Sequence, residues 1–149
     1  MYSDSKGTEV TTITNDGETL RMFVRGCEFS GGSFDSFFPS HEATADQLEQ
    51  FSLYDDCLCA CQIKCSIPIP IFNPPTQTNG HLEIEVDLGN PTRTGSLDRE
   101  DLRISLCYED KRIVGSGKSG WFEDELLEIQ AQLPDGIYMM ACINCQFSD

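Results

Sequence analysis

Basic residues are scarce in this sequence: 10 Lys+Arg stand against 25 Asp+Glu, which gives a formal net charge of -15. The few basic residues are scattered, whereas a protein that binds DNA or RNA clusters them to neutralise phosphates. We therefore expect no nucleic-acid partner. The acid excess would steer a basic protein partner toward the chain, although a high net charge also simply keeps a protein soluble.

Long apolar runs are missing as well, since none approaches the ~20 residues that a membrane-spanning helix needs. The opening residues, Met-Tyr-Ser-Asp-Ser-Lys-Gly, lack the basic segment and apolar stretch of a secretory signal. These absences predict no membrane segment and a cytoplasmic location. The length of 149 residues, 39% of them hydrophobic, predicts a single domain over 1–149 that builds its own core.

Cysteine, in contrast, is abundant, with eight in the chain. In a cytoplasmic protein these residues are reduced thiols, metal ligands or core residues rather than disulfides. Cys57, Cys59, Cys61 and Cys65 share one face of a predicted strand at 57–72. Strand residues four apart are separated by roughly 13 Å, whereas the sulfur ligands of one zinc ion lie within about 4 Å of one another. We therefore interpret these four cysteines as small buried residues of the core.

Cys142 and Cys145 are the candidate metal ligands, because two thiolates three positions apart are the usual half of a zinc site. The second half is not evident. Cys27, Cys107 or one cysteine of the 57–72 strand would have to supply it. Structural zinc is thus the one cofactor that the sequence leaves open, and no catalytic or cofactor-binding residue is assigned.

Alternation of apolar and polar residues predicts β-strands over much of the chain. The predicted strands are 8–14 and 18–25 around an Asn-Asp-Gly turn, 57–72, 81–88, 101–108, 112–114 and 137–143. The stretch 31–53 is predicted to be irregular, apart from a short helix at 43–51 with Thr44 as its N-cap.

The one strong helix pattern lies at 121–133, where four apolar residues form a single stripe: Phe122, Leu126, Ile129 and Leu133. Together with the strands, this helix predicts a mainly β (α+β) fold. We expect an antiparallel β-sandwich-like domain with one well-defined amphipathic helix near 121–133.

The sequence Gly-Ser-Gly-Lys-Ser-Gly at 115–120 is similar to a phosphate-binding loop but lacks the spacing that such a loop needs. Glu123, Asp124 and Glu125 follow in the first turn of the predicted helix, where they would repel a phosphate. We therefore expect this segment to connect two elements and cap the helix.

An acidic row, Glu83, Glu85 and Asp87, alternates along a predicted strand with His81 in line. Paired carboxylates can perform acid–base chemistry or bind calcium, but on the exposed face of a strand they are more often only solvated. The second histidine, His41, is distant in sequence, and no nucleophile motif accompanies either one.

Four stretches resemble an uncharacterised bacterial family of small acidic proteins, catalogued as a domain of unknown function. They are Gly-Gly-Ser-Phe-Asp at 31–35, Leu-Asp-Arg-Glu-Asp-Leu at 97–102, Gly-Trp-Phe-Glu-Asp-Glu-Leu-Leu at 120–127 and Ala-Cys-Ile-Asn-Cys-Gln-Phe-Ser-Asp at 141–149. The resemblance implies that the chain is a C-terminally shortened member of that family. It implies no activity, so it transfers no functional residue.

These observations favour a non-enzymatic cytoplasmic acidic binding protein, such as an inhibitor or immunity-type protein for a basic partner. The alternatives are a structural zinc protein that uses Cys142 and Cys145, an enzyme that uses the acidic row, and an inhibitor whose carboxylates imitate DNA phosphates.

Overall fold

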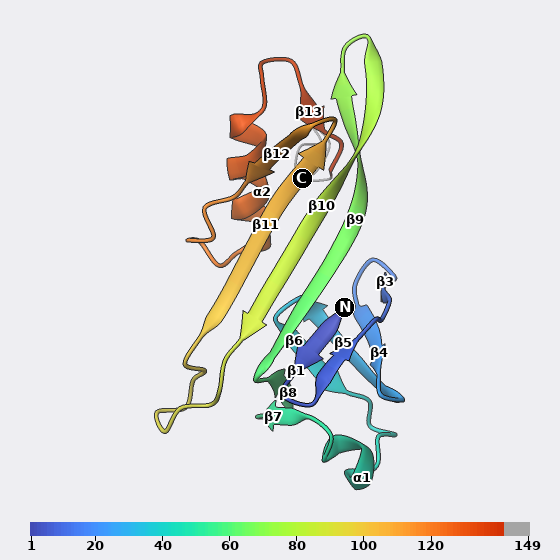
Figure 1. Ribbon diagram of the computed structural model, residues 1–149, viewed down its shortest axis with the longest axis vertical. Helices are drawn as coiled ribbons and strands as arrows, with labels where there is room; N and C mark the ends of the chain where they lie inside the picture. Colours follow the sequence, from blue (N-terminus) through green and yellow to red (C-terminus); the bar gives the residue numbers. More distant parts are fainter. Residues whose placement is uncertain (142–149) are drawn as a thin grey trace. The chain divides into compact units, whose positions relative to one another are not determined.

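The computed structural model describes residues 1–141, which form a mainly β protein with antiparallel sheets and two helices (Figure 1). The predicted fold class, mainly β of the α+β kind, is confirmed. The strands are β1 (Tyr2–Asp4), β2 (Gly7–Glu9), β3 (Ile13–Asn15), β4 (Leu20–Val24), β5 (Cys27–Ser33), β6 (Ser36–Pro39), β7 (Ser52–Tyr54), β8 (Cys57–Cys59), β9 (Cys61–Asn73), β10 (Thr76–Leu88), β11 (Glu100–Tyr108), β12 (Lys111–Val114) and β13 (Tyr138–Met139). The helices are α1 (Ala45–Leu48) and α2 (Phe122–Gln132).

The strands make three sheets. The largest has the order β12-β11-β10-β9-β1-β2, and β13 also pairs with β9. The second has the order β3-β4-β5-β6, and β7 pairs with β8 in the third. The chain divides into two compact units: unit 1 comprises Met1–Cys65 and Val86–Asp101, and unit 2 comprises Ser66–Glu85 and the chain from Leu102 onward.

Aromatic rings build the core of unit 1. Tyr2 of β1 and Phe29 of β5 are both buried. Each meets the ring of Phe51 edge-on, with centroids 6.1 Å and 4.7 Å away. Edge-to-face rings add stability beyond the area that they bury. The Phe51 ring thus joins a strand of the largest sheet to a strand of the four-stranded sheet.

In unit 2, α2 lies beside β12 (Figure 1). Its predicted apolar stripe is confirmed at Leu126, Ile129 and Leu133, which are at most 8% exposed. The predicted alternation of β10 is confirmed too, since Leu82 and Ile84 are buried on the same face. Within residues 1–141, no helix has the length and apolar character needed to span a membrane.

The cysteine-rich strand is the clearest departure from the sequence prediction. The prediction of one continuous strand over 57–72 is wrong, because Ala60 has φ +50° and separates β8 from β9. A left-handed residue breaks the period of two that an extended strand imposes. Cys59 and Cys61 are nevertheless both buried, whereas Ile67, predicted to lie on the same face, is 36% exposed.

The stretch 31–53 is more regular than predicted, since it contains the end of β5, all of β6 and the start of β7. The predicted helix is shorter, but its N-cap is confirmed. The Thr44 hydroxyl accepts a hydrogen bond from the backbone N–H of Gln47 (3.4 Å), and the Gln47 side chain accepts one from the Thr44 N–H (2.9 Å). This reciprocal pair is a capping box.

Candidate functional site

The predicted zinc ligands, Cys142 and Cys145, lie outside the described residues. Among residues 1–141, no group of three His, Cys, Asp or Glu side chains has the arrangement of a metal site. The structural-zinc hypothesis therefore stays a prediction.

The cysteines of unit 1 are buried or half-buried free thiols. Burial raises the pKa of the Cys61 thiol to about 12, and the neighbouring Cys59 adds to that shift. Burial also raises the pKa values of Cys57 and Cys59. A reactive cysteine needs a lowered pKa, so these residues serve the core, as we interpreted them from the sequence.

The acidic row of β10 is paired with arginines at both ends. Glu83 Oε2 lies 2.9 Å from Arg112 Nη2, and Asp87 Oδ1 lies 2.8 Å from Arg99 Nη2. These side chains are part-exposed, so each pair contributes little stability. Glu83 and Asp87 are therefore salt-bridged residues on the strand surface. This pairing does not favour a catalytic role for the acidic row.

The glycine–serine segment at 115–120 surrounds a carboxylate of its own chain. Glu125 is fully buried and accepts hydrogen bonds from the backbone N–H groups of Gly117 (2.8 Å) and Ser119 (3.3 Å). Glu128 accepts one from the Ser116 N–H (2.9 Å), and the hydrogen bonds from Ser116 lower the Glu128 pKa. The segment thus connects β12 to α2, as the sequence predicted. It binds two acids of the helix, while the predicted capping is not seen as a side-chain hydrogen bond at the N-cap, Trp121.

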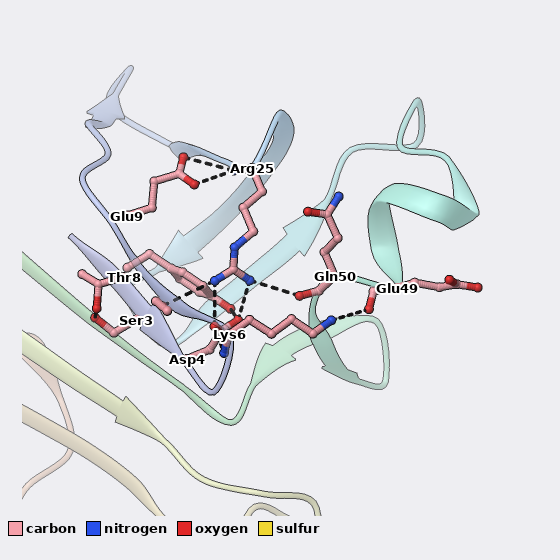
Figure 2. A network of polar contacts seen from close by, with 10 residues as sticks. Ser3, Asp4, Lys6, Thr8, Glu9, Arg25, Glu49 and Gln50 are labelled. Atoms are coloured by element: carbon pink, nitrogen blue, oxygen red, sulfur yellow. Dashed lines mark hydrogen bonds and ion pairs between the residues drawn. The ribbon is translucent and has the colours of Figure 1, made fainter.

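A more informative region surrounds the tight turn between β4 and β5. Arg25 and Gly26 form this turn with φ angles of +48° and +73°, and Val24 pairs with Cys27 across it. Two positive φ angles are typical of a type I′ hairpin turn. The backbone N–H of Arg25 donates to both carboxylate oxygens of Glu9, at 3.1 and 3.2 Å (Figure 2).

On one side of the turn, the Arg25 side chain is held in what we call the arginine cradle: Tyr2, Asp4, Gln50 and Phe51. The Arg25 guanidinium donates two 2.7 Å hydrogen bonds to the Asp4 carboxylate and a 3.1 Å bond to the Gln50 carbonyl (Figure 2). The guanidinium carbon lies 5.5 Å from the Tyr2 ring centroid and 5.6 Å from that of Phe51. A bidentate ion pair and two cation–π contacts therefore hold one cation.

The cradle is largely shielded from solvent, because only 15% of the Arg25 side chain and 7% of the Asp4 side chain are exposed. The hydrogen bonds from Arg25 lower the Asp4 pKa, against the opposing effect of burial. The Tyr2 hydroxyl donates a 3.1 Å hydrogen bond to the same carboxylate, and burial raises the Tyr2 pKa. The cradle is thus a satisfied structural cluster.

Gly26 of the same turn lines an open hollow of about 350 Å³. Its lining includes Phe23, Cys27, Glu28, His41, Glu42 and Gln47. This volume is at the lower end of the range for ligand pockets. We call this feature the hollow, and it is the candidate functional site.

Backbone hydrogen bonds hold the walls of the hollow in place. The Ser40 N–H donates to the Glu28 carbonyl (2.8 Å), and the Ala43 N–H donates to the Ser40 carbonyl (2.9 Å). The Gln47 side-chain amide donates to the Gly26 carbonyl (3.2 Å). The first bond joins the loop before α1 to the β4–β5 hairpin, the second lies within that loop, and the third joins α1 to the hairpin.

The chemistry of the hollow is aromatic and acidic. Phe23 is 58% exposed and lies directly across the strand pair from Glu28. Arg21 Nη1 approaches the Glu28 carboxylate only to 3.6 Å, which is too long for a good hydrogen bond. Burial, followed by the Glu28 charge, raises the pKa of the Cys27 thiol, so this thiol is not an activated nucleophile.

Sequence reasoning did not identify the hollow. Its wall joins residues from the β4–β5 hairpin and from the loop after β6, and no local motif predicts that contact. One usable signal was Arg25-Gly26 between two apolar strand patterns, because glycine at a tight turn brings the flanking strands together.

No curated protein and no solved structure matches the chain. A family model does match it, over residues 1–148. This confirms the resemblance to an uncharacterised family; the bacterial origin and the acidity stay expectations. The chain therefore belongs to a family of unknown function, DUF6304.

Proposed function

We propose that this protein is a non-enzymatic, acidic binding protein whose partner is a basic protein, and that the partner docks at the hollow. An inhibitor or immunity-type protein would act in this way. The proposal concerns binding alone, because the acidic row is salt-bridged and the described thiols with shifted pKa values are all shifted upward.

The observation that carries the proposal is the pairing of an exposed phenyl ring with carboxylates in one hollow. Phe23 offers its ring, and Glu28 and Glu42 offer negative charge. Aromatic faces and carboxylates both attract cations, whereas the two glutamates would repel an anionic ligand.

The charge of unit 1 supports the same conclusion. Unit 1 carries 15 acidic and six basic residues. A field of this sign draws a basic protein toward the surface and disfavours acidic competitors.

A cytoplasmic location forms part of the proposal. Six cysteines of the described chain are free: Cys27, Cys57, Cys59, Cys61, Cys65 and Cys107. Free thiols fit a reducing compartment.

The test uses a short peptide that contains both arginine and lysine as a stand-in for the basic partner. Calorimetry at low and high salt measures its affinity for the whole protein. We expect binding to weaken as salt rises, because the attraction is electrostatic. The double variant Glu28→Gln, Glu42→Gln should weaken binding about fivefold or more, since two charge contacts are lost.

The matched control is Glu123→Gln, Asp124→Asn, which removes the same two charges from exposed positions on α2. This control should change the affinity by less than about twofold, because its charges lie outside the hollow. Equal weakening by both double variants would mean that net charge alone attracts the peptide, and the hollow would lose its assignment. Salt-independent binding would overturn the electrostatic proposal itself.

A further inference from the structure

We infer that the hollow accepts the guanidinium of an arginine side chain from the basic partner, in preference to the ammonium of a lysine. This inference rests on the proposed function and adds the chemistry of the group that is recognised. It comes from a comparison of the hollow with the arginine cradle, which belongs to the same unit.

The cradle shows how this protein holds a guanidinium. The guanidinium carbon of Arg25 lies over two aromatic rings, 5.5 and 5.6 Å from their centroids, while one carboxylate accepts two hydrogen bonds from the guanidinium at 2.7 Å. The three parts of the arrangement are a ring, a carboxylate and a planar cation.

The hollow presents the first two parts of this arrangement. Phe23 on β4 and Glu28 on β5 are direct cross-strand partners, so their Cβ atoms are separated by roughly 5 Å. As direct partners they lie on the same face of the strand pair, and both line the hollow. A cation that enters can therefore contact the ring and the carboxylate together.

The nearby Arg21 does not act as the planar cation of the hollow. Arg21 Nη2 is held 3.2 Å from Asp16 in the β3–β4 turn, and its other terminal nitrogen stays 3.6 Å from Glu28. A carboxylate has about four acceptor positions. Glu28 thus keeps acceptor capacity for a ligand.

Arginine fits this arrangement better than lysine for two physical reasons. A guanidinium is planar and weakly hydrated, so it stacks on a ring and gives two parallel hydrogen bonds to a carboxylate. An ammonium is compact and strongly hydrated, and it binds as a point charge. The exposed Phe23 ring therefore provides the preference, while Glu28 and Glu42 attract either cation.

Two peptides of equal charge test the inference: a glycine–serine peptide with three arginines and the same peptide with three lysines. We expect the arginine peptide to bind about two- to fivefold more tightly, the range of an exposed cation–π contact. Phe23→Ala should abolish this preference by weakening the arginine peptide more than the lysine peptide. Phe38→Ala is the matched control, since Phe38 is the other exposed phenylalanine of the same sheet and does not line the hollow.

The outcomes separate the inference from the proposed function. A preference for arginine that Phe23→Ala removes and Phe38→Ala keeps supports the inference. Equal affinities for the two peptides, or equal effects of the two variants, overturn it. The proposed function survives the loss of the arginine preference if both peptides still bind more weakly to the Glu28→Gln, Glu42→Gln variant. If neither peptide binds more weakly to that variant, the inference and the proposed function are both overturned.

Discussion

The arginine cradle and the hollow meet at one two-residue turn, since Arg25 occupies the cradle and Gly26 lines the hollow. Each combines at least one aromatic ring with at least one carboxylate, and they differ mainly in what fills them. In the cradle, the Arg25 side chain is only 15% exposed, and both terminal nitrogens of its guanidinium donate hydrogen bonds. In the hollow, Phe23 is 58% exposed, and the Arg21 guanidinium stays 3.6 Å from Glu28.

The difference separates a cluster that stabilises the fold from a hollow that we propose as a recognition site. A buried charge must keep its partner, because removing one member leaves the other desolvated and unpaired. An exposed carboxylate stays hydrated and contributes little to stability. Changes in the cradle should therefore act on folding, and changes in the hollow should act on binding.

The largest expected effect comes from Arg25→Leu, which leaves the Asp4 carboxylate buried without its cation. We expect a loss of about 3–5 kcal/mol in the free energy of unfolding, as for other broken buried pairs. Urea denaturation monitored by circular dichroism measures it. The Glu28→Gln, Glu42→Gln variant should stay within about 0.5 kcal/mol of the parent, and a comparable loss there would remove the distinction between the two regions.

Acid pH should act on the cradle through Asp4. Because Arg25 lowers the Asp4 pKa in the folded state, the unfolded chain takes up this proton first. The stabilisation is fully present above pH ~4, the ordinary range of an aspartate, and is lost as pH falls through the lower folded pKa. Unfolding experiments from pH 7 to pH 2 should show a shallower acid loss in Asp4→Asn than in Asp46→Asn, an exposed control. Identical pH slopes in the two variants would contradict the coupling.

The cradle shows where sequence reasoning reached its limit. The Asn-Asp-Gly hairpin was predictable, since the Asp16 side chain accepts hydrogen bonds from the N–H groups of Glu18 (3.1 Å) and Thr19 (2.9 Å) within the turn itself. The pair of Asp4 and Arg25 joins residues 21 positions apart, and no local pattern encodes that distance. The helix at 122–132 was predictable for the same reason as the hairpin, because its apolar stripe is local.

Gly26 connects the two regions, and a side chain there should disturb both slightly. Its φ of +73° is strained for other residues, although an added Cβ would meet no atom within 4 Å. Gly26→Ala should therefore lower the free energy of unfolding by about 1–2 kcal/mol from backbone strain alone. Gly32→Ala is the control, because Gly32 also has open space but no positive φ. Equal losses in the two variants would show that the turn conformation is not the cause.

The smallest effect should come from Arg21→Gln, beside the hollow. This change removes a positive charge 3.6 Å from Glu28, so the arginine peptide should bind about twofold more tightly. The free energy of unfolding should change by less than about 0.5 kcal/mol, since the Arg21 side chain is 48% exposed. Weaker peptide binding in this variant would indicate that Arg21 belongs to the site instead of competing with its ligand.

Two features of the sequence were misjudged for physical reasons. A left-handed alanine at position 60 is unusual, because positive φ is unfavourable for a residue with a Cβ, so the break between β8 and β9 had no signal. Phe23 was predicted only as part of the strand at 18–25. The role that we propose for Phe23 depends on residues 40–47, which line the same hollow only in the folded chain.

The most direct test of the account is a backbone amide NMR titration of the whole protein with the three-arginine peptide. We predict that the amide shifts concentrate at residues 23–28 and 40–47, which form the hollow, while those of Tyr2 and Asp4 in the cradle stay unchanged. Shifts spread evenly over acidic positions of both units, or concentrated on α2, would contradict the assignment of the hollow as the binding site.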